Sequence, residues 1–154
     1  MKISLRMAVV VLCLLSLFGC GKKDRHILDG PGMVREVTWQ EFTLSQQSDV
    51  YEENYSLTVR WDQGNDAFYL YVYTIATAAD DPEPIRLKSK TVNRILSMDF
   101  LGLPNEQPSD LELEILDGTF SDFQVIDQDG VTYKKVLSYE MEQELKQLLL
   151  PYRG

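Results

Sequence analysis

Tyrosine alternates with other apolar residues in one short stretch of the chain, and this spacing could serve ligand binding. Tyr69, Tyr71 and Tyr73 are each separated by one residue, so a β-strand would place all three rings on one face. Such a stripe can stack on sugar rings or grip an apolar peptide, because tyrosine combines a large contact area with a polar tip. The alternative is that the stripe packs beneath a helix with its hydroxyl groups at the rim, and we favour this packing role.

Four cations form a second candidate group a short distance along the chain. Arg86, Lys88, Lys90 and Arg94 fall within nine residues, near the N-terminus of a predicted helix. This arrangement could receive an anionic partner. The alternative, which we favour, is that these side chains provide solubility and charge balance in an acidic protein. Together with the tyrosines they make up the candidate binding surface.

The residue types needed for most catalytic sites are scarce. The chain has one histidine, His26, so no imidazole base is available to the folded part beside a nucleophile. A zinc site would need several histidine or cysteine ligands. The pairs Glu112 and Glu114, and Asp80 and Asp81, could serve a hydrolase that uses carboxylates alone, but 24 acidic residues make chance pairs common. We therefore predict a protein that is not an enzyme and that has no cofactor and no metal site.

The N-terminal segment has the charge layout of a secretory signal. Lys2 and Arg6 precede an uncharged, mostly aliphatic stretch over residues 7–18. As a helix this stretch would span about 18 Å, against about 30 Å for a bilayer core. The stretch ends in Leu17-Phe18-Gly19-Cys20, which resembles the lipobox of bacterial lipoproteins. In that family the chain is cleaved before the cysteine, so the resemblance implies a signal peptide over residues 1–19 and a lipid on Cys20.

This resemblance implies an extracytoplasmic protein anchored to the cell membrane, or to the outer membrane if the source has one. The other cysteine, Cys13, lies within the segment that would be removed, so the mature protein would have neither a disulfide nor a free thiol. The net charge of −9 argues against nucleic acid as a partner, because Lys and Arg contacts with phosphate supply most of that affinity. We expect an unidentified protein or envelope component as the partner, in addition to the membrane.

Composition divides the remainder into two parts. Residues 20–35 are polar and turn-rich, which predicts a lipidated flexible tether. Its polar part would reach about 50 Å when fully extended and about 20 Å as a random coil. Residues 36–154 are long enough for a single domain with a hydrophobic core.

The first half of this domain reads as strands. The strand over residues 37–44 changes the parity of its apolar residues, which predicts a β-bulge near Gln40-Glu41. Residues 55–61 alternate between apolar and polar types, as in a half-buried strand. After a turn over residues 62–66, the strand over residues 68–75 is apolar or aromatic on both faces, which favours a central position in the sheet.

A helix and a second group of strands follow. Ser89 is the predicted N-cap of a helix of about ten residues that crosses between the two strand groups. The second group opens over residues 111–115 and contains two hairpin signals, Asp117-Gly118 and Asp129-Gly130. Ser138 caps a C-terminal helix. We predict an α+β fold with antiparallel strands in two three-strand meanders, a crossover helix and a C-terminal helix.

The folded part also resembles small uncharacterised bacterial lipoproteins. The resemblance rests on Ile85-Arg86-Leu87, the helix that begins at Ser89, Leu103-Pro104 and the Asp-Gly turns. It implies no activity and no role for any residue.

These observations favour a non-catalytic module that binds a protein or an envelope component near a membrane. One alternative is an inhibitor or accessory subunit of an extracytoplasmic enzyme, with the acidic loop over residues 80–84 as its wedge. A second alternative is a hydrolase that uses carboxylates alone.

Overall fold

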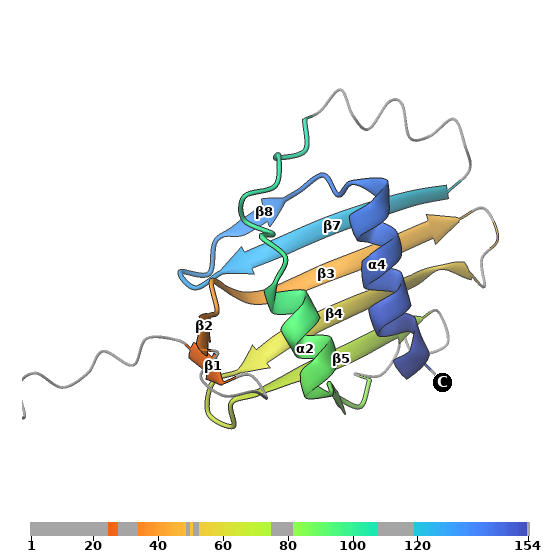
Figure 1. Cartoon of the computed structure of the whole chain (residues 1–154). Coiled ribbons are helices and arrows are strands. Elements are labelled where there is room, and N and C mark those ends of the chain that lie inside the picture. Colours follow the sequence, from red (N-terminus) through yellow and green to blue (C-terminus); the bar gives the residue numbers. More distant parts are fainter. Residues whose placement is uncertain are drawn as a thin grey trace, which may run out of the picture.

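The computed structural model describes residues 25–27, 34–48, 50, 53–74, 82–107 and 119–153. They form one six-stranded antiparallel sheet, a separate pair of short strands, and two α-helices that lie across the same face of the large sheet (Figure 1). The α+β class is therefore confirmed. The strands of the large sheet, in order from one edge to the other, are β6 (Ile85–Arg86), β5 (Ala67–Thr74), β4 (Tyr55–Asp62), β3 (Trp39–Ser48), β7 (Thr119–Asp127) and β8 (Thr132–Lys134).

A β-bulge in β3 brings all the apolar residues of this strand to one face. The register with β7 shifts between Trp39 and Glu41, as the sequence predicts. Trp39 and Phe42 consequently both enter the core, at 2% and 0% exposure. The Gln128 side chain donates hydrogen bonds of 3.1 Å to the backbone carbonyls of Val37 and Trp39. These bonds satisfy carbonyl groups beside the irregularity, where a buried unpaired carbonyl would be costly.

The core lies between the sheet and the helices and is rich in aromatic rings. Phe100, from the segment after the first helix, reaches to within 4.9 Å of Phe42 and 5.1 Å of Phe123, measured between ring centroids. The Trp39 ring meets Phe68 at 5.6 Å with an interplanar angle of 64°, an edge-to-face geometry that aromatic rings prefer. One cluster thus joins β3, β5, β7 and the segment that follows the first helix.

The first of the two predicted helices is shorter than expected and starts differently. Helix α2 (Ser89–Leu96) has Lys88 as its N-cap, with no side-chain cap hydrogen bond. The prediction that Ser89 is the cap is therefore wrong, because the extended residue is Lys88 and Ser89 already lies in the first helical turn. Val92 and Ile95 are buried against the sheet. The helix ends at Leu96 and has eight residues, where the sequence predicts about ten.

The C-terminal helix begins where the sequence predicts. In α4 (Tyr139–Leu149) the Ser138 hydroxyl accepts a 3.2 Å hydrogen bond from the Met141 backbone N–H. Leu145 and Leu149 are fully buried. The chain continues as a 3₁₀ turn, η4 (Leu150–Tyr152). Leu150 and Tyr152 of this turn also pack against the core.

Two turn predictions are confirmed and one position is corrected. Asp62 accepts hydrogen bonds from the backbone of Gly64 and Asn65 in the β4–β5 turn. Gly130 has φ of 81° in the β7–β8 turn, a conformation that glycine adopts without strain. Strand β5 is not central, since its outer neighbour β6 has two residues and forms the edge. The predicted strand over residues 111–115 and the turn at Asp117-Gly118 lie outside the described residues.

A small hairpin occurs within the predicted tether. Strands β1 (Arg25–Ile27) and β2 (Val34–Glu36) pair antiparallel, with His26 opposite Arg35 in the register. The chain enters the core directly afterwards, at Val37. The predicted signal peptide and Cys20 lie outside the described residues. No helix among the residues that were placed is long and apolar enough to cross a bilayer.

Candidate functional site

The tyrosine stripe lies on the face of the sheet opposite the helices α2 and α4 (Figure 1). On β5, Phe68 and Leu70 are buried in the core, at 2% and 0% exposure. The residues between and after them, Tyr69, Tyr71 and Tyr73, project to the opposite face because strand residues alternate, and each is half-buried. The packing role that we favoured for the stripe is therefore wrong. We call this side of the sheet the open face.

Strand register places polar residues in rows beside the rings. Tyr69 is paired with Arg60 of β4 and Arg86 of β6, and paired residues project to the same face. Tyr71 is paired with Thr58, and Tyr73 with Ser56. The next strand, β3, continues these rows with Glu41, Thr43 and Ser45. On the open face, the row of tyrosines on β5 therefore lies beside short hydroxyl side chains on β4 and β3.

The hydroxyl groups are joined in pairs across β3 and β4. Thr43 and Thr58 are 2.9 Å apart, measured between their Oγ1 atoms. The Oγ atoms of Ser45 and Ser56 are 2.5 Å apart. These short side chains keep the middle of the open face low relative to the tyrosine rings.

Arg60 lies at the Tyr69 end of the open face. Its Nε donates a 2.7 Å hydrogen bond to Glu41 Oε2, and this bond raises the pKa of the guanidinium. Its Cζ lies 4.9 Å from the centre of the Tyr71 ring, within the range of a cation–π contact. Thr58, on the same face, is only 6% exposed. Accessible hydroxyls are consequently found at the Ser45–Ser56 end.

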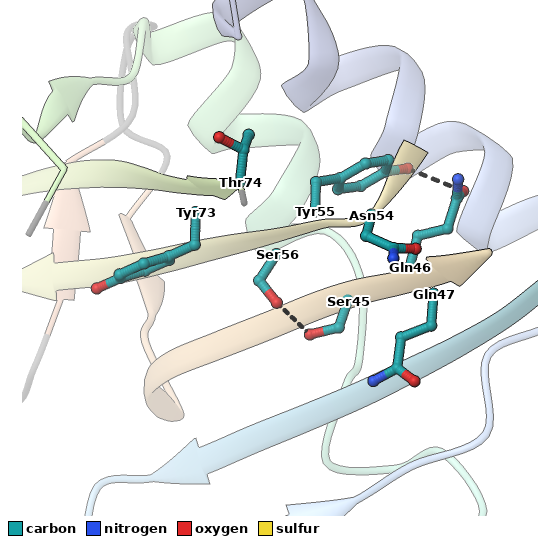
Figure 2. A pocket seen from close by; sticks show the side chains of 8 residues that line it. All are labelled: Ser45, Gln46, Gln47, Asn54, Tyr55, Ser56, Tyr73 and Thr74. Atoms are coloured by element: carbon teal, nitrogen blue, oxygen red, sulfur yellow. Dashed lines mark hydrogen bonds between the residues drawn. The ribbon is translucent and has the colours of Figure 1, made fainter. Parts of the chain in front are cut away.

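A shallow hollow of about 490 Å³ lies at that end, between the ends of β3, β4 and β5. Figure 2 shows Ser45, Ser56 and Tyr73 directed away from the helices, with the Tyr55 ring and Gln46 directed toward them. Tyr55 donates a 3.2 Å hydrogen bond to Gln46 Oε1, and burial raises the pKa of its hydroxyl. The described residues that line this hollow are Ser45, Gln46, Gln47, Asn54, Tyr55, Ser56, Tyr73 and Thr74.

A second hollow, of about 600 Å³, lies at the other end of the stripe. It is bounded by the Tyr69 and Tyr71 rings, by the β4–β5 turn and by Pro84. The described residues that line it are Arg60, Trp61, Asp62, Gln63, Gly64, Tyr69, Tyr71 and Pro84. The three tyrosines thus connect two hollows.

The structure separates most of the predicted cations from the tyrosines. Arg86 shares the open face through its pairing with Tyr69. Lys88 and Lys90 are exposed at the N-terminal end of α2. Arg94 forms an ion pair with Glu144 of α4. The seven residues predicted as one binding surface therefore form at least two surfaces, and only the tyrosines and Arg86 belong together.

Most of the candidate catalytic residues lie outside the part of the chain that the structure describes. The backbone of His26 lies in β1. The pairs Glu112 and Glu114, and Asp80 and Asp81, lie outside the described residues. No group of three or more His, Cys, Asp or Glu suited to a metal ion occurs where the structure places side chains.

Sequence reasoning missed the polar side of the site. Ser45, Gln47 and Ser56 lie at the outward positions of two alternating strands, so their parity was readable. Their partnership with Tyr73 was not, because it depends on the register between β4 and β5. In comparisons with known proteins, no family model, no curated protein and no solved structure matches this chain.

Proposed function

We propose that this protein is a membrane-anchored, extracytoplasmic binding module without catalytic activity, and that it binds its partner through the open face of the sheet. The observation that supports this proposal is the stripe of Tyr69, Tyr71 and Tyr73 on a face that α2 and α4 leave uncovered. The partner is a component of the cell envelope.

The composition of the open face favours recognition over simple solvation. Antiparallel sheets commonly leave one face to water, and such a face is then polar. Here the same strand places Phe68 and Leu70 on one side and three tyrosines on the other. Half-buried tyrosines beside hollows offer apolar contact area and hydroxyl groups together, the combination that binding surfaces use.

The anchoring part of the proposal rests on the sequence Leu17-Phe18-Gly19-Cys20. Two acyl chains provide stable membrane attachment, whereas one chain gives only marginal binding. The segment between Cys20 and Val37 would hold the domain within a few nanometres of the bilayer. An envelope component would therefore meet the open face at high local concentration.

Photo-crosslinking in intact cells tests the proposed binding face. Tyr73 is replaced by the photoreactive residue p-benzoyl-phenylalanine, and Tyr139 is replaced in a matched control. Tyr139 is 75% exposed at the start of α4, on the side of the sheet that carries the helices. We expect a discrete adduct from position 73 and none from position 139, read by electrophoresis and mass spectrometry. Equal labelling at both positions, or no adduct at position 73, would contradict the proposal.

A further inference from the structure

We propose that the ligand of the open face is a neutral oligosaccharide that lies along the tyrosine stripe. This inference deepens the proposed binding function and depends on it. It assigns the hollow beside Tyr73 as a sugar subsite and the hollow beside Tyr69 as a second one.

The first observation is the absence of charge among the side chains known to line the hollow beside Tyr73. The chain has 24 acidic and 15 basic residues. Yet the eight described residues that line this hollow are all uncharged, and each has a hydroxyl or amide group. Such a lining matches a polar and neutral ligand, because it offers hydroxyl and amide partners but no described counter-charge for an ionic group.

The second observation is that the lining presents donors and acceptors side by side. The Ser45 and Ser56 hydroxyls share one hydrogen bond, which leaves one hydroxyl hydrogen and several lone pairs for a ligand. The amide of Gln47 lies exposed at the rim and has both a donor and an acceptor. A sugar hydroxyl likewise donates and accepts, so adjacent hydroxyls of a sugar complement this arrangement.

The third observation is the spacing of the rings. Alternate residues of a strand are about 7 Å apart, so Tyr69 and Tyr73 are separated by about 14 Å. A pyranose ring has an apolar face of C–H groups that packs on an aromatic ring, and tyrosine offers such a ring with a polar tip. Because the hollows lie at opposite ends of the stripe, the ligand is a chain of sugars and not a single one.

Other ligand classes fit the open face less well. An anionic polymer needs several available cations, but of the two arginines described on the open face Arg60 is paired with Glu41, which leaves Arg86. An apolar peptide would bury the Ser45 and Ser56 hydroxyls against groups that cannot hydrogen-bond with them. A peptide added at the edge beside β5 would find only the two-residue strand β6 there.

Calorimetric titration with defined oligosaccharides tests the inference. The full-length chain is kept in a zwitterionic detergent that contains no sugar, and is titrated with chitohexaose, cellohexaose and maltohexaose. We expect at least one of these to bind, and a shorter homologue of the same sugar to bind more weakly. Sulfated dextran serves as the anionic comparison and should not bind more tightly than the neutral probes.

Three variants connect binding to the proposed subsites. Tyr73→Ala should weaken binding roughly tenfold, because it removes one stacking surface. Ser56→Ala should weaken it several-fold, and Tyr139→Ala on the helix side should leave it unchanged. Thermal unfolding of each variant verifies that the domain remains folded, which matters because Ser56 lies on a central strand.

The outcomes separate this inference from the proposed function. If no neutral oligosaccharide binds while position 73 crosslinks a protein in cells, the sugar assignment is overturned and the binding face stands. If sugar binding survives Tyr73→Ala unchanged in a folded variant, the location of the subsite is overturned. If neither a sugar nor a crosslinked partner is found, both proposals fail.

Discussion

At the scale of single residues, Asp127 shows how one side chain fixes a turn. Its Oδ1 accepts 2.9 Å hydrogen bonds from the backbone N–H groups of Val131 and Asp129, and its Oδ2 accepts one from the Tyr133 hydroxyl. The bond from Val131, followed by those from Tyr133 and Asp129, lowers the pKa of the Asp127 carboxyl. The charged form of Asp127 is therefore the form that stabilises the β7–β8 turn.

This shift predicts a pH dependence of stability. Because the folded-state pKa lies below the unfolded value of about 3.9, the stabilisation is complete above that value and is lost as the pH falls through the folded pKa. Asp127→Asn should therefore be less stable than the native protein at pH 7, and the difference should shrink by pH 2. Urea unfolding at both pH values measures it. A difference that stays constant between pH 7 and pH 2 would contradict this role.

Lys135 is a buried lysine whose structural role could not be predicted from its residue type. Its ammonium group donates to the backbone carbonyls of Leu101 and Leu103, at 2.9 and 3.0 Å, and the residue is only 8% exposed. It ties the segment after α2 to the strand end beyond β8. The sequence gives no sign of this, since lysines are rarely buried and the two carbonyl groups are brought to it only by the fold.

At the scale of elements, the two helices offer a matched comparison of capping. Ser138 accepts a hydrogen bond from Met141 N–H at the start of α4, whereas Ser89 is not the cap of α2. Ser138→Ala should lower the free energy of unfolding by about 1 kcal/mol. Ser89→Ala should change it by less than about half of that, since no cap is lost. Urea denaturation of the two variants makes the comparison, and equal losses would refute the assignment of the caps.

The strands show where periodicity is sufficient and where it is not. The bulge in β3 was predictable because only a shift in parity brings Trp39 and Phe42 to one side. Strand β5 has apolar or aromatic residues on both faces, so its pattern could not show which face meets the helices. In the structure Phe68 and Leu70 are buried on the side of the helices, and the tyrosines lie on the open face.

At the scale of the whole molecule, the six-stranded sheet depends on long-range pairing. Strand β3 lies between β4, its neighbour in sequence, and β7, which follows far along the chain. Sequence patterns predict the strands and the class of the fold, but they do not specify which edge of the first strand group the later strands join. The described linings of both hollows come from β3, β4, β5 and their adjoining turns, and they depend on the register between these strands, so the candidate site could be predicted only in part.

The two faces of the sheet have different roles in the proposed anchored protein. The side with α2 and α4 contains the core, whereas we propose that the open face, which these two helices leave uncovered, meets an envelope component (Figure 1). Such binding would depend on attachment of the domain to a membrane through its N-terminus, and the lipid proposed on Cys20 would provide that attachment.

Mass spectrometry of the protein isolated from membranes of its own source tests whether Cys20 is lipidated. We expect the N-terminal residue to be Cys20, with its sulfur in a thioether to a diacylglyceryl group and residues 1–19 removed. We also expect Cys20→Ser to shift the protein out of the membrane fraction. An unmodified Cys20 sulfur, or a native protein that still has residues 1–19, would contradict the account.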